Sequence, residues 1–173
     1  MEDGVTLVSG TAFVELFRTF AHTARRLEVR DRYDSPSEHE PLRRFLAGEP
    51  KDMGWIQNWT RDVGQAVADG KVFQRVRVVS VPLSDYARFG LDLSRHNIAT
   101  GEDIRSVDRR DAEGVPGFDY WVFDSARAWR GWTSPRRTSC SARRSLSTIT
   151  LLSQVDGLSI TELSHLPGAR SRY

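Results

Sequence analysis

The residues of this sequence best able to do chemistry are arginines and acids that gather near the ends of predicted strands: Arg77, Glu102, Asp103, Arg105, Asp119 and Asp124. Guanidinium groups bind anions through paired hydrogen bonds, and nearby carboxylates can orient the bound ligand. We therefore predict a ligand site at the edges of adjacent strands, where Arg77 and Arg105 hold an anion. The accompanying carboxylates of this predicted site are Glu102, Asp119 and Asp124.

The same cluster also fits a purely structural role. Arg75 or Arg77 on one strand can form an ion pair with an acid directly opposite on the neighbouring strand. Ion-pair networks of this kind are common in folded proteins, and no motif in the sequence marks a reaction. We favour the structural interpretation, while the ligand site stays open.

The motifs of several enzyme classes are missing from the sequence. It contains no phosphate-binding Gly-x-x-x-x-Gly-Lys, no dinucleotide-binding Gly-x-Gly-x-x-Gly and no Gly-x-Ser-x-Gly nucleophile elbow. The four histidines are not paired at metal-ligand spacing, and the single cysteine, Cys140, has no evident base beside it. We expect no catalytic residue, no metal ion and no cofactor.

The elements that must position the cluster are helices followed by strands. Apolar residues at spacings of three and four predict a helix from Thr11 to Ala24, and charged and apolar residues then alternate over Arg26–Arg30. Further helices are predicted from Ser35 to Gly48, where Ser35 and Pro36 begin the helix, and from Met53 to Asp69.

The second half of the chain predicts a strand–helix–strand–strand core. The strands are Val72–Ser80, Asp103–Val107 and the apolar run Tyr120–Phe123, and Ser84 begins the intervening helix. A crossover with one helix makes its two strands parallel neighbours. We predict an α/β fold, with α+β as the alternative, in which N-terminal helices pack on a small mixed sheet.

The net charge of +2 conceals two different regions. Residues 1–124 hold 21 acidic and 17 basic side chains, whereas residues 125–173 hold 2 acidic and 8 basic ones. We predict an N-terminal segment at 1–10, one domain at 11–124 and an atypical basic tail at 125–173. Because the basic excess lies in this tail, we expect no direct nucleic-acid binding by the domain. The single cysteine and the lack of a long apolar run predict a cytoplasmic protein with no membrane segment.

Several blocks of residues 13–124 resemble a family of actinobacterial domains of unknown function that are often encoded near helix-turn-helix regulators. The most specific blocks are Arg75–Tyr86, Asn97 to Arg105 and Asp119–Asp124. A second likeness is to phospholipase-D-like modules, which share the strand–helix–strand–strand order. Asp124 matches the acid that ends their last strand, but their catalytic His and Lys have no counterpart here. The second likeness thus implies a degenerate, non-hydrolytic version.

The resemblance also suggests an origin for the tail. Members of the family continue after Asp124 with a strand, an acidic stretch and Leu-Gly-Ala, and a neighbouring reading frame of codons 128–144 can encode such a sequence. We interpret residues 125–173 as frameshifted, or else as a disordered basic tail. On the frameshift interpretation the strand after Asp124 is lost, and Tyr120–Phe123 has an unpaired edge.

These observations predict a non-enzymatic regulatory or interaction module that partners a helix-turn-helix regulator. The alternative is a sensor or enzyme for a phosphate-bearing small molecule, built on a degenerate phospholipase-D-like core.

Overall fold

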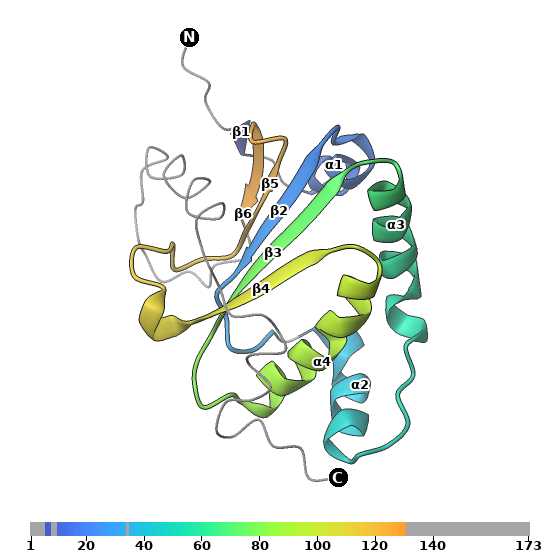
Figure 1. Ribbon diagram of the computed structural model, residues 1–173, viewed down its shortest axis with the longest axis vertical. Coiled ribbons are helices and arrows are strands. Elements are labelled where there is room, and N and C mark those ends of the chain that lie inside the picture. The colour runs from blue at the N-terminus through green and yellow to red at the C-terminus, as the bar shows by residue number, and fades with distance from the viewer. Residues whose placement is uncertain (1–5, 8–9, 34, 131–173) are drawn as a thin grey trace.

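A computed structural model of the chain describes residues 6–7, 10–33 and 35–130, which form helices and one mixed sheet (Figure 1). The strands are β1 (Thr6–Leu7), β2 (Thr23–Glu28), β3 (Val72–Val79), β4 (Asp103–Asp108), β5 (Tyr120–Phe123) and β6 (Arg127–Arg130). The helices are α1 (Thr11–Thr19), α2 (Pro36–Leu46), α3 (Gln57–Ala68) and α4 (Asp85–Ala99), with 3₁₀ turns at Gly54–Ile56 and Arg109–Asp111. The predicted α/β class is confirmed.

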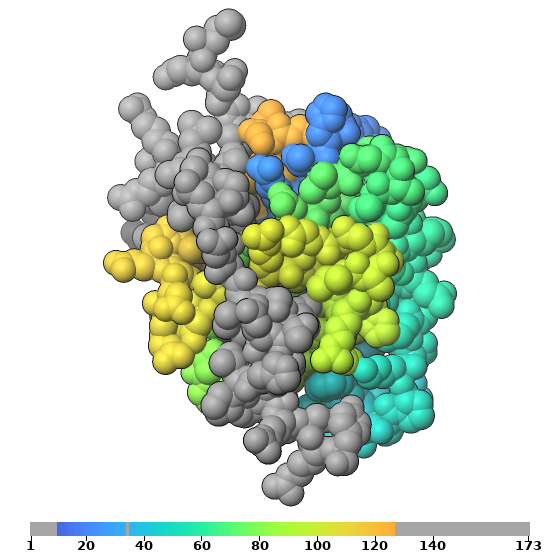
Figure 2. Space-filling model, in the orientation of Figure 1, coloured from blue at the N-terminus to red at the C-terminus, as the bar shows by residue number. Residues whose placement is uncertain are grey.

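The sheet has the strand order β1-β6-β5-β2-β3-β4. Strands β2, β3 and β4 run parallel, whereas β5 is antiparallel to both β2 and β6. The four helices lie on one side of the sheet (Figure 1), and α2, α3 and α4 form the right-hand surface of the molecule in Figure 2. We call the sheet face toward the helices the inner face and the opposite one the outer face.

The inner face is aromatic at the end where β2 and β3 begin. Its buried core consists of Leu16, Phe20, Ala24, Val63, Phe73, Trp121 and Phe123. Phe17 and Trp59 pack against this core from α1 and α3, with ring centroids 5.7 Å apart. Helices α1 and α3 therefore bury their predicted apolar stripes on this end of the sheet.

The strand–helix–strand core predicted for the second half of the chain is confirmed. β3 and β4 are parallel neighbours, and α4 connects them. The hydroxyl of Ser84 accepts a hydrogen bond from the amide of Ala87, which caps α4 as its position predicts. The last strand of this core, β5, does not pair with β4, because it crosses the sheet and pairs with β2.

The first helix is shorter than its apolar stripe predicts. α1 ends at Thr19, and Phe20 already has an extended backbone. Phe20 and Ala24 are both buried, as the stripe requires, but Ala24 reaches the core from β2. The physical reason is a competing acceptor: the amides of residues 21–23 donate to the carboxylate of Asp124 instead of to the preceding helical turn.

The expected unpaired edge beside Tyr120–Phe123 is wrong. β6 pairs antiparallel with all four residues of β5 and so places β5 inside the sheet. Strand pairing uses backbone N–H and C=O groups, so a segment with an unusual side-chain composition can still join a sheet. The ordered sheet thus extends beyond Asp124, to Arg130. The remainder of the proposed frameshifted or disordered tail, residues 131–173, lies outside the described residues.

Candidate functional site

Five charged side chains meet on the inner face, beyond the aromatic core: Arg26, Glu28, Arg75, Arg77 and Glu102. We call them the charge network. Two pairs are set by the register of β2 and β3, in which Arg26 lies beside Arg75 and Glu28 beside Arg77. Because alternate residues of a strand point to the same face, the four side chains share the inner face. Glu102, the residue immediately before β4, is the fifth member.

Arg75 lies between the two glutamates of the charge network. Its Nε and one terminal nitrogen donate to the two carboxylate oxygens of Glu102 at 2.9 and 3.0 Å. Its other terminal nitrogen lies 3.4 Å from Glu28. This bidentate geometry is the strongest form of an arginine–carboxylate pair. The Glu102 side chain is completely buried, so the pair is shielded from water.

Glu28 accepts from three arginines. Arg77 Nε donates to it at 2.7 Å, and Arg26 approaches to 2.9 Å, in addition to Arg75. Burial alone would raise the pKa of Glu28, but Arg26, Arg77 and Arg75 lower it by more, so its pKa lies well below the usual value. Glu28 and Glu102 likewise raise the pKa of Arg75, although burial opposes this shift. Glu28 and Arg75 are therefore both ionised at neutral pH.

The lowered pKa of Glu28 predicts an acid-dependent contribution to stability. The carboxyl group is more acidic in the folded than in the unfolded chain, where its pKa is near 4.5. Its stabilisation is therefore complete above this pH and is lost as the pH falls toward the folded-state pKa. We expect Glu28→Gln to lower the urea midpoint strongly at about pH 6 and much less at about pH 3. An equal loss at both pH values would contradict this assignment.

A glycine brings α4 close to the charge network. A Cβ atom at Gly90 would lie 2.4 Å from one terminal nitrogen of Arg77. The missing side chain thus leaves room for the guanidinium between the helix and β3. The absence of a side chain at Gly90 therefore lets α4 pack closely against the guanidinium of Arg77.

Two acids of the predicted ligand site bind backbone amides instead. Asp119 is buried and accepts from the amide of Val29 at 2.8 Å, with Arg30 at 3.7 Å. Asp124, just after β5, accepts from the amides of Ala21 at 2.8 Å, His22 at 2.7 Å and Thr23 at 2.9 Å. Both carboxylates thereby hold the two ends of β2 against the segment that contains β5.

The two arginines predicted to grip an anion are not brought together. Arg105 neighbours Val76 in the β3–β4 register, whereas Arg77 neighbours Ser106. Arg105 therefore lies on the outer face and Arg77 on the inner face. The exposed Arg105 binds Asp103 of its own strand, with both hydrogen bonds at 3.2 Å. Of the predicted site residues, the structure joins only Arg77 and Glu102, through Glu28 and Arg75.

A further polar cluster joins the carboxyl ends of the parallel strands. It was not predicted from the sequence. Ser80 donates its hydroxyl to Asp31 at 3.0 Å and accepts from Arg109 Nε at 2.9 Å. Arg109 also donates to the carbonyl of Val29 at 2.8 Å. Burial raises the pKa of Asp31, but hydrogen bonds from Arg109 and Ser80 outweigh it and lower the pKa overall. A usable signal was present, because Asp31 and Arg109 closely follow predicted strands and Ser80 ends one.

The part of the chain that the structure describes contains neither a grouped set of metal ligands nor a membrane-spanning helix. In residues 6–7, 10–33 and 35–130, no three His, Cys, Asp or Glu side chains are grouped so as to hold a metal ion. No helix in this part of the chain is long and apolar enough to cross a membrane.

The chain belongs to the family described as "Domain of unknown function (DUF6879)", whose model matches residues 11–153. The match includes every helix and the strands β2–β6. A comparison with curated proteins gave no match. The family assigns the chain to a group of related domains without assigning it a reaction.

Proposed function

We propose that this domain is a non-enzymatic regulatory or interaction module that acts in the cytoplasm and partners a helix-turn-helix DNA-binding regulator. The observation that carries the proposal is the structural use of the polar residues that could do chemistry. Glu28, Glu102 and Asp119 are buried against arginines or a backbone amide, and Asp124 binds three amides. Groups held in this way are engaged in internal contacts, and removing one partner would leave a buried charge unpaired.

The resemblance to actinobacterial domains encoded near helix-turn-helix regulators supports the choice of partner. Because these ionised groups are engaged in internal contacts, we infer that the domain acts through its surface. The helical side of the sheet offers such a surface, because α2, α3 and α4 are all accessible there (Figure 2).

Co-purification tests this proposal. We expect the full-length chain to co-elute in size-exclusion chromatography with the helix-turn-helix regulator encoded beside its gene. A helix-turn-helix regulator from an unrelated locus is the control and should elute separately. Separate elution of the neighbouring regulator, at concentrations up to about 100 μM, would overturn the proposed partnership.

A second candidate is a sensor of phosphate-bearing molecules on a degenerate phospholipase-D-like core. One observation favours it: the charge network contains three arginines but only two glutamates, so it holds an excess positive charge. Inorganic phosphate, a nucleotide and a phosphosugar should then raise the melting temperature of the chain. The response should be lost in Arg77→Gln and kept in Arg105→Gln, which changes the outer face.

A further inference from the structure

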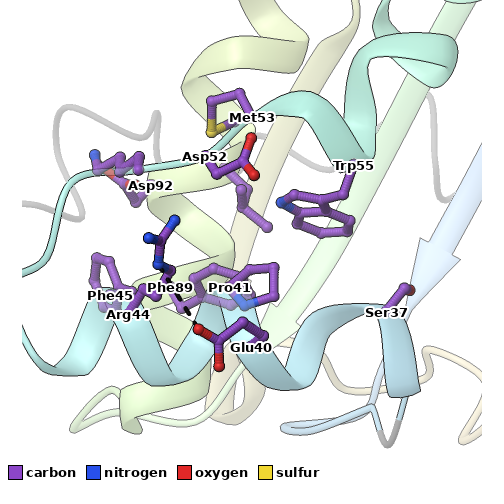
Figure 3. A pocket seen from close by; sticks show the side chains of 12 residues that line it. Ser37, Glu40, Pro41, Arg44, Phe45, Asp52, Met53, Trp55, Phe89 and Asp92 are labelled. Atoms are coloured by element: carbon purple, nitrogen blue, oxygen red, sulfur yellow. Dashed lines mark hydrogen bonds and ion pairs between the residues drawn. The ribbon is translucent and has the colours of Figure 1, made fainter.

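A cavity lies on the helical side, away from the charge network. It has a volume of about 170 Å³, is partly open to solvent and is lined by α2, by the connection from α2 to α3 and by α4 (Figure 3). We call it the α2–α4 pocket. Its size suits a small organic molecule, since a single water needs only about 10–15 Å³ measured in the same way.

One part of the pocket wall is apolar. Phe89 of α4 is 3% exposed and packs on Phe45 of α2, with ring centroids 5.6 Å apart. Leu93 continues this surface along α4, and Trp55 lines the pocket from the connection and lies above Pro41 in Figure 3. Such a wall favours a ligand with an aliphatic or aromatic body.

Arg44 supplies a cation whose hydrogen-bonding capacity is largely unused. The neighbouring acids Glu40 and Glu49 are both hydrogen-bonded by Arg43, at 2.8–3.0 Å. Arg44 is left with longer ion pairs to them, at 3.7 and 3.4 Å. These separations exceed a normal N–H···O hydrogen bond, so the guanidinium retains donors for a carboxylate. Figure 3 shows it reaching from α2 toward the connection that carries Asp52.

Asp52 supplies an anion on the opposite wall. One of its carboxylate oxygens accepts from the amide of Gly54 at 2.8 Å, which holds the side chain in place at the pocket. Its carboxylate keeps a second oxygen with which to accept from an ammonium group. The remaining charges at this end neutralise each other, because Lys51 and Asp92 form an ion pair at 2.6 Å.

We propose that the α2–α4 pocket binds a small zwitterion of the free apolar amino-acid class. Arg44 receives the carboxylate, Asp52 receives the ammonium group, and the side chain lies on Phe45, Phe89 and Leu93. This site is separate from the predicted anion site on the strands. A bound ligand would change how α2 packs against α4. A small molecule could thereby regulate the module. The assignment stands independently of the helix-turn-helix partner.

Isothermal titration of the full-length chain without any partner tests the proposal. Leucine and phenylalanine should bind and raise the melting temperature, whereas glycine, which lacks the apolar body, should bind at least about tenfold more weakly. Phenethylamine lacks the carboxylate and 3-phenylpropionate lacks the ammonium group, so both should also bind at least about tenfold more weakly than phenylalanine. Binding of phenethylamine as tight as that of phenylalanine would overturn the zwitterion assignment, as would no binding of either amino acid up to about 10 mM.

Two charge-removing variants locate the site. Arg44→Gln and Asp52→Asn should each weaken phenylalanine binding at least about tenfold, because each loses a charged hydrogen bond. The matched controls are Arg61→Gln and Asp62→Asn, an exposed ion pair of α3 outside the pocket. These controls should bind phenylalanine like the original chain. Urea midpoints near the original value establish that the four variants are folded, and unchanged affinity in folded Arg44→Gln and Asp52→Asn would overturn the placement.

Discussion

Arg75→Met should lower the free energy of unfolding by about 3–5 kcal/mol, because it breaks a buried ion pair and leaves a charge without a partner. Glu102 loses the most hydrogen bonds, since Arg75 donates both of those to its fully buried carboxylate. Glu28 is affected less, because Arg26 and Arg77 still contact it. Urea unfolding monitored by circular dichroism measures the change.

A double-mutant cycle separates the ion pair from the packing of the arginine side chain. Adding Glu102→Gln to Arg75→Met removes the unpaired charge and should recover part of the lost stability. Arg105→Met is the matched control, since within the described part of the chain this exposed arginine pairs with Asp103 alone, on the outer face, and its loss should change stability by less than about 0.5 kcal/mol. A loss below about 1 kcal/mol for Arg75→Met would contradict the role given to the charge network.

Asp124→Ala should lower the free energy of unfolding by about 2–4 kcal/mol, because three amides then lose a charged acceptor. The amides belong to residues 21–23, at the start of β2, so the change also releases the connection from α1 into the sheet. Urea unfolding again gives the size of the effect. Hydrogen exchange at the three amides gives its location, and we expect all three to exchange faster.

The backbone at Asp124 requires its own control, because its φ angle is 50°. Asparagine tolerates a positive φ angle and retains one acceptor oxygen, whereas alanine does neither. Glycine relieves the strain but provides no acceptor. Stability should therefore decrease from the original chain to Asp124→Asn and then to Asp124→Gly and Asp124→Ala. An Asp124→Ala variant as stable as the original chain would show that the hydrogen bonds contribute nothing, because alanine removes the acceptor without relieving the backbone.

Both predictions concern contacts between segments that are distant in the sequence. The charge network joins β2, β3 and the start of β4, and Asp124 joins the end of β5 to the start of β2. Their shared role is to fix the order and register of strands on a sheet whose helices all lie on one side. That role supports the proposal of a scaffold that presents its helical surface, including the α2–α4 pocket, to other molecules.

Local patterns in the sequence determined most of the secondary structure. Pro36 begins α2 and Ser84 caps α4, because the geometry of proline and capping both act within one helical turn, although the side chain of Ser35 makes no capping hydrogen bond within the described residues. The apolar run Tyr120–Phe123 predicted a strand buried on both faces, and all four residues of β5 are buried. The single helix between β3 and β4 was enough to make them parallel neighbours, because short crossovers restrict the topology.

Only the tertiary structure decided which charges are buried and which partners they have. Alternation over Arg26–Arg30 indicated that Glu28 shares a face with Arg26, but not what packs against that face. It is buried because Arg75 and Arg77 arrive beside it in the register of a distant strand. Asp124 ends α1 early through hydrogen bonds to a segment about 100 residues away in the sequence. Arg105 lies on the face opposite Arg77 because of the register between β3 and β4. Local sequence patterns do not specify either contact. The α2–α4 pocket likewise exists only where α2, α4 and the connection from α2 to α3 meet.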